Sequence, residues 1–125
     1  MLMSVLSKLL NSFRPALHGV SHVAREEQNF RIQLAVAAVV LVLMFVLSIP
    51  PGEKALLLLA TVLVLVLELL NSVFERITDL MKPRVHHYVE DIKDMMAGAV
   101  LVAALGAAGI GLAIFWPYLV AIAAR

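Results

Sequence analysis

The chain has no cysteine and few charged residues, and each shortage excludes a kind of site. Without cysteine it cannot form disulfides, thiolate metal sites or a cysteine nucleophile. Charged residues make up 15% of the sequence, with ten Lys and Arg against nine Asp and Glu. No basic stripe of the kind that neutralises a phosphate backbone is present, so nucleic acid is not expected as the main partner.

Hydrophobic residues are abundant instead. They make up 62% of the 125 residues, whereas soluble domains contain roughly 45–50%. Burial in a soluble core does not account for this excess. The sequence therefore predicts an all-α integral membrane protein, and we expect a single membrane domain over residues 1–125.

Residues 1–29 predict a surface helix and an entry segment. Apolar residues recur at helical intervals from Met1 to Leu17, with Ser, Lys, Asn and Arg between them. This pattern is typical of an amphipathic helix in the headgroup region, and Pro15 is expected to bend it. A charged patch at residues 25–31 then stands at the mouth of the first apolar segment.

Three apolar segments predict three transmembrane helices, over residues 30–49, 53–80 and 89–116. Crossing a hydrocarbon core of roughly 30 Å takes about 20 such residues. The breaker Pro50-Pro51-Gly52 separates the first two, and Trp116-Pro117-Tyr118 is expected to end the third. Lys and Arg gather before the first segment and around the second loop. This asymmetry predicts a multi-pass protein of the cell inner membrane with a cytoplasmic N-terminus.

A polar stripe continues directly out of the second apolar segment. Glu68, Asn71, Ser72, Glu75 and Asp79 fall at i, i+3, i+4, i+7 and i+11, so they share one helix face. An ionisable residue inside a bilayer is costly and indicates a functional site. Seven residues at about 1.5 Å each place Glu68 roughly 10 Å deeper than Glu75. We expect Asp79 to be a structural partner for a cation near the helix end.

The shallow carboxylates suit a hard cation and phosphate. Mg²⁺ takes oxygen ligands and commonly only one or two protein carboxylates beside substrate phosphates, a need that Glu27 and Glu75 meet. Lys93 offers a cation for phosphate oxygens during phosphoryl transfer. Glu68 lies at the depth of a lipid hydroxyl, where a carboxylate in apolar surroundings is a better general base than a solvated one. No Walker A or kinase glycine-rich loop is present.

Three segments carry a recognisable signature: Glu27 with Phe30 and Arg31, Glu68-Leu69-Leu70-Asn71-Ser72 with Glu75 and Asp79, and His86 with Lys93-Asp94. Together they resemble the prokaryotic diacylglycerol kinase family, which also includes undecaprenol kinases. The resemblance covers nearly the whole chain. It implies a small integral membrane kinase with a surface helix and three transmembrane helices, which works as a homotrimer whose active sites lie between neighbouring subunits.

The resemblance also implies roles for individual residues. It makes Glu68 the catalytic base, supported by Asn71, and it makes Glu27 and Glu75 the Mg²⁺ ligands. The ATP-binding residues that it implies are Lys8, Glu27, Glu75, Arg84, Val85, His86, Lys93 and Asp94. The lipid-substrate residues that it implies are Phe30, Arg31, Glu68 and Ser72. Two positions depart from the pattern, since some members have tyrosine in place of Pro15 and glutamate in place of Gln33.

Each candidate also has an interpretation without a catalytic or binding role. Glu68 would then be a polar bundle residue paired with Asn71, Glu27 and Glu75 would face headgroup water, and Lys93 would only extend to the interface. We assign Glu26 to the solvated boundary of the membrane.

We therefore expect an ATP- and Mg²⁺-dependent kinase that phosphorylates a lipid alcohol at the cytoplasmic face. Diacylglycerol, giving phosphatidate, is the expected substrate, and undecaprenol is the alternative. A proton-coupled transporter that uses Glu68 as a carboxylate switch is a more distant alternative. It gives no reason for Glu27, Glu75 and Lys93 to gather at one mouth. A non-catalytic membrane scaffold has no use for any of these residues.

Overall fold

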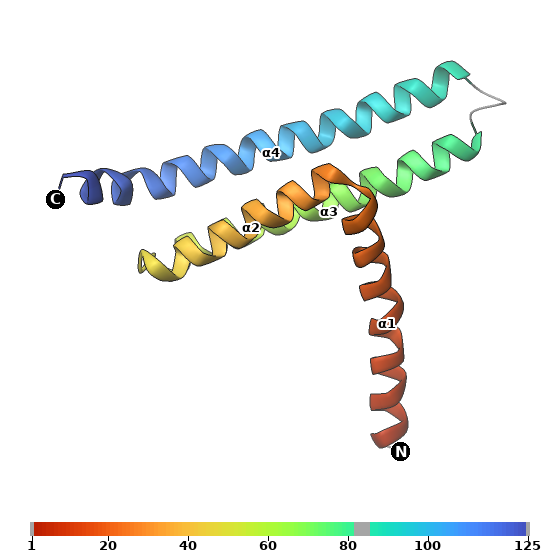
Figure 1. Ribbon diagram of the computed structural model, residues 1–125, viewed down its shortest axis with the longest axis horizontal. Helices are drawn as coiled ribbons and strands as arrows, with labels where there is room; N and C mark the ends of the chain where they lie inside the picture. The colour runs from red at the N-terminus through yellow and green to blue at the C-terminus, as the bar shows by residue number, and fades with distance from the viewer. Residues whose placement is uncertain (1, 82–85, 125) are drawn as a thin grey trace.

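The computed structural model describes residues 2–81 and 86–124. In these residues it contains four helices and no strand: α1 (Leu2–Glu26), α2 (Gln28–Val46), α3 (Pro51–Met81) and α4 (His86–Ala123). Helices α2 and α4 each pack along α3, and α1 leaves the bundle at a steep angle (Figure 1). The expectation of an all-α fold is confirmed.

Three of the helices are long and apolar enough to cross a membrane: Gln28–Val46, Pro51–Met81 and His87–Ala123. The 19 residues of α2 rise roughly 28 Å, which matches a hydrocarbon core of about 30 Å. Each helix begins a few residues before the span predicted for it, and the order of the three spans agrees with the prediction.

The connection between α2 and α3 shows why the first span ends early. The backbone N–H of Leu47 donates to the carbonyl oxygen of Leu43 at 2.9 Å, and Ser48 then adopts a left-handed φ of 51°. A residue in this conformation commonly follows the last turn of a helix. Pro51 is the first residue of α3, where its fixed φ suits a helix and its missing N–H has no intrahelical partner to lose.

Helix α4 differs from the prediction at its end. It runs through Pro117 to Ala123, whereas Trp116-Pro117-Tyr118 was expected to end the helix. A single proline removes one backbone hydrogen bond, and neighbouring helices and local adjustments make this tolerable in transmembrane helices. Helix α1 likewise runs through Pro15 without ending.

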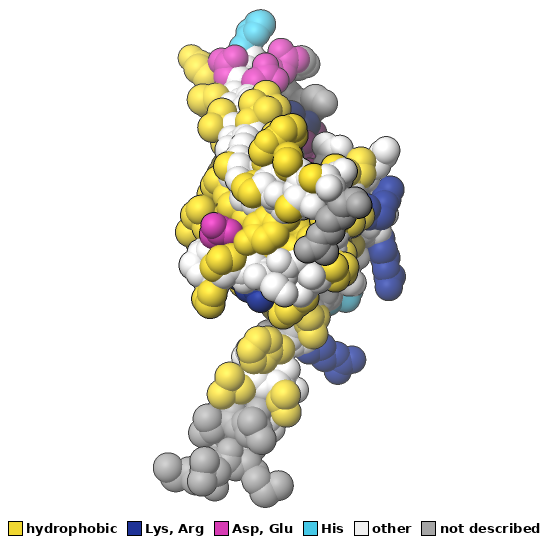
Figure 2. Space-filling model, turned by 90° about the vertical axis from the view of Figure 1, so that its left-hand side faces the viewer, with side chains coloured by type: hydrophobic (Ala, Val, Ile, Leu, Met, Phe, Trp, Pro, Cys, Tyr) yellow, Lys and Arg dark blue, Asp and Glu magenta, His cyan; other side chains and the backbone are white. Residues whose placement is uncertain are grey.

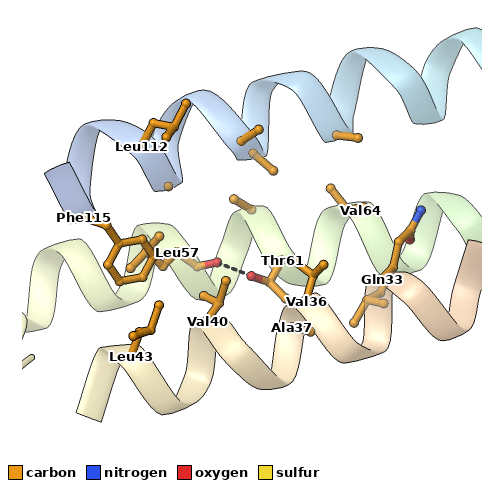
Figure 3. Close-up of a pocket in the computed structure, with 16 residues that line it drawn as sticks. Gln33, Val36, Ala37, Val40, Leu43, Leu57, Thr61, Val64, Leu112 and Phe115 are labelled. Atoms are coloured by element: carbon orange, nitrogen blue, oxygen red, sulfur yellow. Dashed lines mark hydrogen bonds between the residues drawn. The ribbon is translucent and has the colours of Figure 1, made fainter. Parts of the chain in front are cut away.

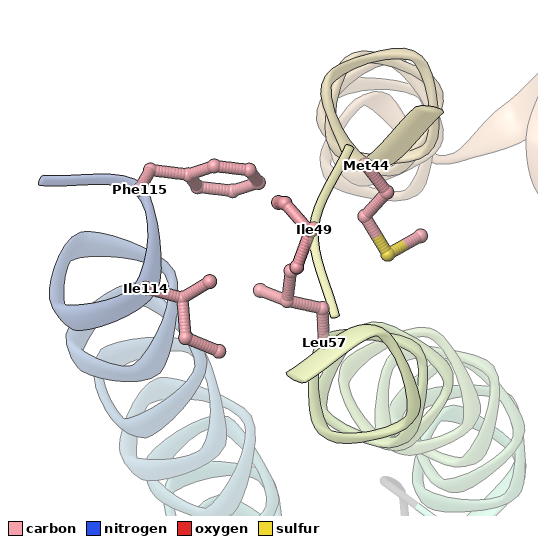
Figure 4. Close-up of a cluster of buried hydrophobic side chains, with 5 residues drawn as sticks. All are labelled: Met44, Ile49, Leu57, Ile114 and Phe115. Atoms are coloured by element: carbon pink, nitrogen blue, oxygen red, sulfur yellow. The ribbon is translucent and has the colours of Figure 1, made fainter. Parts of the chain in front are cut away.

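A small apolar core joins the three long helices at the end of the bundle that carries the α2–α3 connection. It consists of Met44, Ile49, Leu57, Ile114 and Phe115. The Phe115 ring on α4 points toward Ile49 in the connection, and Leu57 lies below them on α3 (Figure 4). Since lipid is as apolar as leucine, such contacts stabilise a membrane bundle through close packing.

Most other large apolar side chains remain exposed on this single chain, including Val42, Phe45, Leu59 and Leu105. The view along the bundle shows hydrophobic side chains over much of its surface, while acidic side chains gather at one extremity (Figure 2). This distribution agrees with a bundle whose sides face lipid or other helices.

Candidate active site

Glu68 is buried on α3, with 4% of its surface exposed. The buried polar residues of the described chain are Glu68, Ser72 and Thr78, and all three lie on this helix. The Ser72 hydroxyl donates to the backbone carbonyl oxygen of Glu68 at 3.2 Å, and Thr78 donates to that of Glu75 at 2.9 Å. Both hydroxyls are satisfied within the helix, so Glu68 is the buried group whose charge needs partners from elsewhere.

Residues from three segments surround the Glu68 carboxylate. The side chain of Gln33 on α2 is its hydrogen-bonding neighbour, and Glu27 and Glu75 are close enough to act on it electrostatically. Glu27 is the residue between α1 and α2, with extended backbone angles at the start of α2. The fold therefore brings together three carboxylates that are up to 48 positions apart in the sequence.

Two amide side chains flank the carboxylates. Asn71 donates from Nδ2 to Oε1 of Glu75 at 3.1 Å. Its Oδ1, and the Oε1 of Gln33, are buried without a hydrogen-bond partner among the described atoms. Such unpaired buried oxygens are uncommon and point to an unoccupied role as acceptor or ligand. Gln33 was singled out from the sequence only as a departure, and its place beside Glu68 depends on how α2 packs on α3.

Lys93 on α4 pairs with Asp79 on α3, with Nζ 2.7 Å from Oδ1. The prediction that Asp79 is a partner for a cation near the helix end is thereby confirmed. Glu75 is also near enough to act on the Lys93 ammonium. This pair links the start of α4 to the carboxylates on α3, and a phosphate that binds Lys93 has to compete with Asp79 for it.

A second ion pair joins the end of α1 to α3, at the residue that follows Glu75. Arg76 donates from Nη2 to Oε2 of Glu26 at 2.8 Å, and Nε2 of His22 lies 3.4 Å from the same oxygen. Glu26 was assigned to the solvated boundary of the membrane, and its side chain is indeed 53% exposed; the structure adds a partner for it on α3. Nothing in the sequence pattern marks this pair, because it joins residues fifty positions apart on two helices.

The predicted lipid-side residues are placed in different environments. Phe30 is buried at 1% exposure and Ser72 is buried one turn from Glu68, so both form the interior of the chain. Arg31 is exposed, and its Nη1 donates to the carbonyl oxygens of Arg25 at 2.9 Å and Ala24 at 3.4 Å. A guanidinium in this position satisfies carbonyls at the end of α1 that have no helical partner.

The predicted nucleotide residues are only partly brought together. Asp94 is exposed beside Lys93, and His86 is the first residue of α4, while Arg84 and Val85 lie outside the described residues. Lys8 is exposed on α1, eighteen residues before Glu26 and thus roughly 27 Å away along the helix. Within one chain, Lys8 does not reach the carboxylates.

An apolar groove of about 420 Å³ runs between α2, α3 and α4. Gln33 lies at one end of it, and Leu43, Leu57 and Phe115 lie at the other (Figure 3). Its other polar side chain, Thr61, is satisfied by donating to the carbonyl oxygen of Leu57 at 2.8 Å. One end of the groove is thus lined by Gln33, the residue that also neighbours the buried Glu68 carboxylate.

The carboxylates have a donor set that fits Mg²⁺. Among the described residues no three His, Asp or Glu side chains are placed to hold a metal ion together. Mg²⁺ needs less than that, since it keeps several waters and takes one or two protein carboxylates beside phosphate oxygens. Glu27 and Glu75, with the unpaired Oδ1 of Asn71 next to Glu75, provide such a partial oxygen set.

Comparison with known proteins identifies the family. The profile described as prokaryotic diacylglycerol kinase matches residues 14–115. The chain belongs to this family. It is therefore a lipid kinase with transmembrane helices, and ATP is the phosphate donor that a kinase of this family implies.

The relatives that this chain resembles are named for two different activities, diacylglycerol kinase and undecaprenol kinase. The chain is 37% identical over 119 residues to the diacylglycerol kinase of Synechocystis sp., which covers 94% of this chain and 68% of that protein. It is 36% identical over 114 residues to the undecaprenol kinase of Bacillus subtilis, and the alignment covers 91% of this chain and 93% of that protein. The diacylglycerol kinase of Pseudomonas aeruginosa is 33% identical over 98 residues, with 78% and 80% covered. The resemblance stated from the sequence is confirmed.

Proposed function

We propose that this protein transfers the γ-phosphoryl group of ATP to the hydroxyl group of a membrane lipid, with Mg²⁺, at the cytoplasmic face of the inner membrane. Diacylglycerol is the proposed substrate, and phosphatidate the product. The observation that carries the proposal is the buried Glu68 carboxylate, which lies between the boundary carboxylates Glu27 and Glu75 and the Gln33 end of an apolar groove.

Glu68 is the proposed general base. The lipid hydroxyl oxygen bonds to the γ-phosphorus, the bond from that phosphorus to the bridging oxygen of ADP breaks, and the hydroxyl proton passes to a Glu68 carboxylate oxygen. Gln33 orients this carboxylate from α2. Asn71 acts one step away, because its hydrogen bond to Glu75 at 3.1 Å fixes a carboxylate on the same helix face.

Glu27 and Glu75 are the proposed Mg²⁺ ligands. Both are partly accessible and lie on the side of Glu68 toward the charged end of the bundle. When bound, the ion neutralises the charge on the transferred phosphoryl group. The protein contributes the spacing of the two carboxylates across the α1–α2 junction and α3.

The nucleotide is proposed to lie at the boundary between α3 and the start of α4. Lys93 would exchange Asp79 for phosphate oxygens, which makes Asp79 the group that orients the lysine before ATP binds. Asp94 is exposed next to it. Arg84, Val85 and His86 complete the proposed ATP site on the resemblance alone.

The lipid chain is proposed to lie in the apolar groove. Ten residues of α2 separate Gln33 from Leu43, so the groove extends roughly 15 Å below the reacting hydroxyl. Phe30 and Ser72 support the walls around Glu68 from inside the chain. Arg31 stands at the membrane boundary near the lipid headgroup.

Undecaprenol is the second candidate substrate. The relatives named for the two lipids are 37% and 36% identical to this chain, and the groove walls are apolar along their length. An apolar groove accepts acyl and isoprenyl chains alike, because neither offers polar groups for it to recognise.

A homotrimer with shared active sites, and with α1 on the membrane surface, completes the proposal. Leu9, Leu10, Phe13 and Leu17 are exposed on α1, which suits a helix that rests its apolar face on lipid. Lys8 lies too far from Glu75 in its own chain, so its proposed phosphate contact is to the site of a neighbouring subunit. If Lys8→Met and Glu68→Gln proteins, each impaired alone, regain no activity when mixed in one oligomer, a site shared through Lys8 is refuted.

The decisive experiment is phosphoryl transfer by the purified protein reconstituted in lipid vesicles. ATP and Mg²⁺ are supplied with diacylglycerol in one set of vesicles and undecaprenol in another. We expect phosphatidate from the first. Product from undecaprenol alone would replace the substrate assignment, and product from neither would refute the proposed function. Nucleotide binding with and without Mg²⁺ is measured in the same vesicles. A kinase should bind nucleotide in a Mg²⁺-dependent way, whereas a proton-coupled transporter should show no such dependence.

A further inference from the structure

Two neighbouring pairs of residues face each other across the α1–α3 contact. Glu26 and Glu27 are adjacent where α1 ends, and Glu75 and Arg76 are adjacent on α3. Glu26 and Arg76 are joined directly by an ion pair, in which Nη2 of Arg76 lies 2.8 Å from Oε2 of Glu26. The ion pair therefore connects the immediate sequence neighbours of the two carboxylates proposed to bind Mg²⁺.

The backbone around Glu27 needs such a connection. Glu27 has extended angles, φ −98° and ψ 115°, and its side chain makes no capping hydrogen bond to α2. It is the point at which the chain turns from α1 into α2 (Figure 1). The backbone N–H of Glu27 donates to the carbonyl oxygen of Val23 at 2.8 Å, and its own carbonyl oxygen accepts from the N–H of Arg31 at 3.3 Å. These bonds fix the turn from α1 into α2 but do not join it to α3, so the position of Glu27 relative to α3 depends on what holds the end of α1 against that helix.

The carboxylates make this constraint important. Glu27 and Glu75 each lie within electrostatic reach of Glu68, and like charges repel. Without a cation, repulsion favours movement of the α1–α2 junction away from α3. The Arg76 guanidinium opposes this movement, since its ion pair ties Glu26 to α3. His22, one turn earlier on α1, approaches the same Glu26 oxygen at 3.4 Å.

We propose that the Glu26–Arg76 ion pair is a positioning device that sets the separation of Glu27 and Glu75 before the metal binds, and so raises the affinity of the enzyme for its divalent cation. Neither residue touches the metal or substrate. This inference rests on the proposed function, because it takes Glu27 and Glu75 as the metal ligands.

A role in stability alone predicts a different result. The side chains of Arg76 and Glu26 are 43% and 53% exposed, and exposed ion pairs contribute little to folding stability. A pair that sets the spacing of two metal ligands instead changes metal affinity while the fold persists.

The test is a Mn²⁺ titration followed by electron paramagnetic resonance, with Mn²⁺ as the probe for Mg²⁺ and a non-hydrolysable ATP analogue present. The variants are Glu26→Gln, Arg76→Gln and the double substitution, with Arg25→Gln as the control for the loss of one exposed positive charge. We expect the Mn²⁺ dissociation constant to rise about fivefold in each single variant, the upper end of what an exposed pair contributes. The double variant should equal the singles, because a pair is lost only once.

Two further measurements separate the possible failures. Hydrogen exchange of residues 22–30 should be faster in Arg76→Gln than in Arg25→Gln, and Arg76→Lys should restore part of the Mn²⁺ affinity. If Glu75→Gln weakens Mn²⁺ binding but Glu26→Gln and Arg76→Gln do not, the positioning role is refuted while the proposed function stands. If Glu75→Gln leaves Mn²⁺ binding unchanged, the metal assignment fails and the positioning role fails with it.

Discussion

Replacement of Glu68 by glutamine is the most direct test of the proposed base. Glutamine keeps the length and shape of the side chain and can still hydrogen-bond to Gln33, but it cannot take a proton from a lipid hydroxyl. Loss of a general base typically lowers the rate by about 10²–10⁴-fold, which is roughly 2.7–5.5 kcal/mol of transition-state free energy. We expect kcat to fall within this range.

The same substitution also removes a charge, and its effect can be bounded from the structure. Seven helical residues place Glu68 roughly 10 Å from Glu75, where two unit charges interact by about 1.7 kcal/mol at an effective dielectric constant near 20. Loss of the Glu68 negative charge weakens the binding of a cation nearby but strengthens the binding of the ATP phosphates, so the two effects oppose each other. We therefore expect the KM for MgATP to change much less than kcat.

The assay measures initial rates in vesicles over a range of MgATP and lipid concentrations. Glu53→Gln is the control, because Glu53 is an exposed carboxylate in the first turn of α3, fifteen residues before Glu68 and roughly 22 Å from it. It should leave kcat unchanged. Elution profiles in detergent verify that both variants assemble like the parent protein. A kcat for Glu68→Gln within tenfold of the parent value would show that Glu68 is not the base.

Further substitutions address the metal site, the Lys93–Asp79 pair and the groove. Glu75→Gln should raise the Mg²⁺ concentration for half-maximal rate by about tenfold or more, since one of two protein carboxylates is lost. An unchanged Mg²⁺ response would remove Glu75 from the metal site. Chelation of Mg²⁺ with EDTA should abolish the activity of the parent protein. Lys93→Met should raise the KM for MgATP about 10- to 100-fold through the loss of a charged hydrogen bond, whereas Asp79→Asn should have a smaller effect, and equal effects would indicate that the pair only joins α3 to α4. Ala108→Leu narrows the groove and should raise the KM for the lipid roughly tenfold without changing the KM for MgATP. Ala113→Leu is the control, because Ala113 is exposed and does not line the groove. An unchanged KM for the lipid would show that the lipid tail does not bind in this groove.

The helices could be predicted because their cause is local. Long apolar runs must form helices in lipid, where every backbone group needs a partner, so three spans and their order follow from composition. Their ends depend on more than the local residues. Pro51 starts α3 where the sequence indicated a break, and Pro117 lies inside α4 where it indicated an end. Whether proline ends a helix depends on what packs beside it.

The carboxylates of the site could also be predicted, because their helical spacing and depth are sequence properties. Their partners could not. Gln33 meets Glu68, and Arg76 meets Glu26, only once the rotation of each helix about its axis and its position along the neighbouring helix are known. The pairing of Asp79 was predicted only in part. A cation near the helix end was expected as its partner, but Lys93, which forms the pair, had been assigned to phosphate.

The manner in which the long helices pack bears on how a substrate arrives. Among the described residues the backbones of α2 and α4 each lie close to α3 but not close to each other. No helix backbone of the described chain therefore crosses the groove opposite α3, and Phe115 and Leu43 lie at its deep end. A lipid can then slide in sideways from the bilayer without withdrawing its tail from the hydrocarbon. The part of the tail beyond the roughly 15 Å between Gln33 and Leu43 can stay among the surrounding lipids, so the groove need not measure chain length.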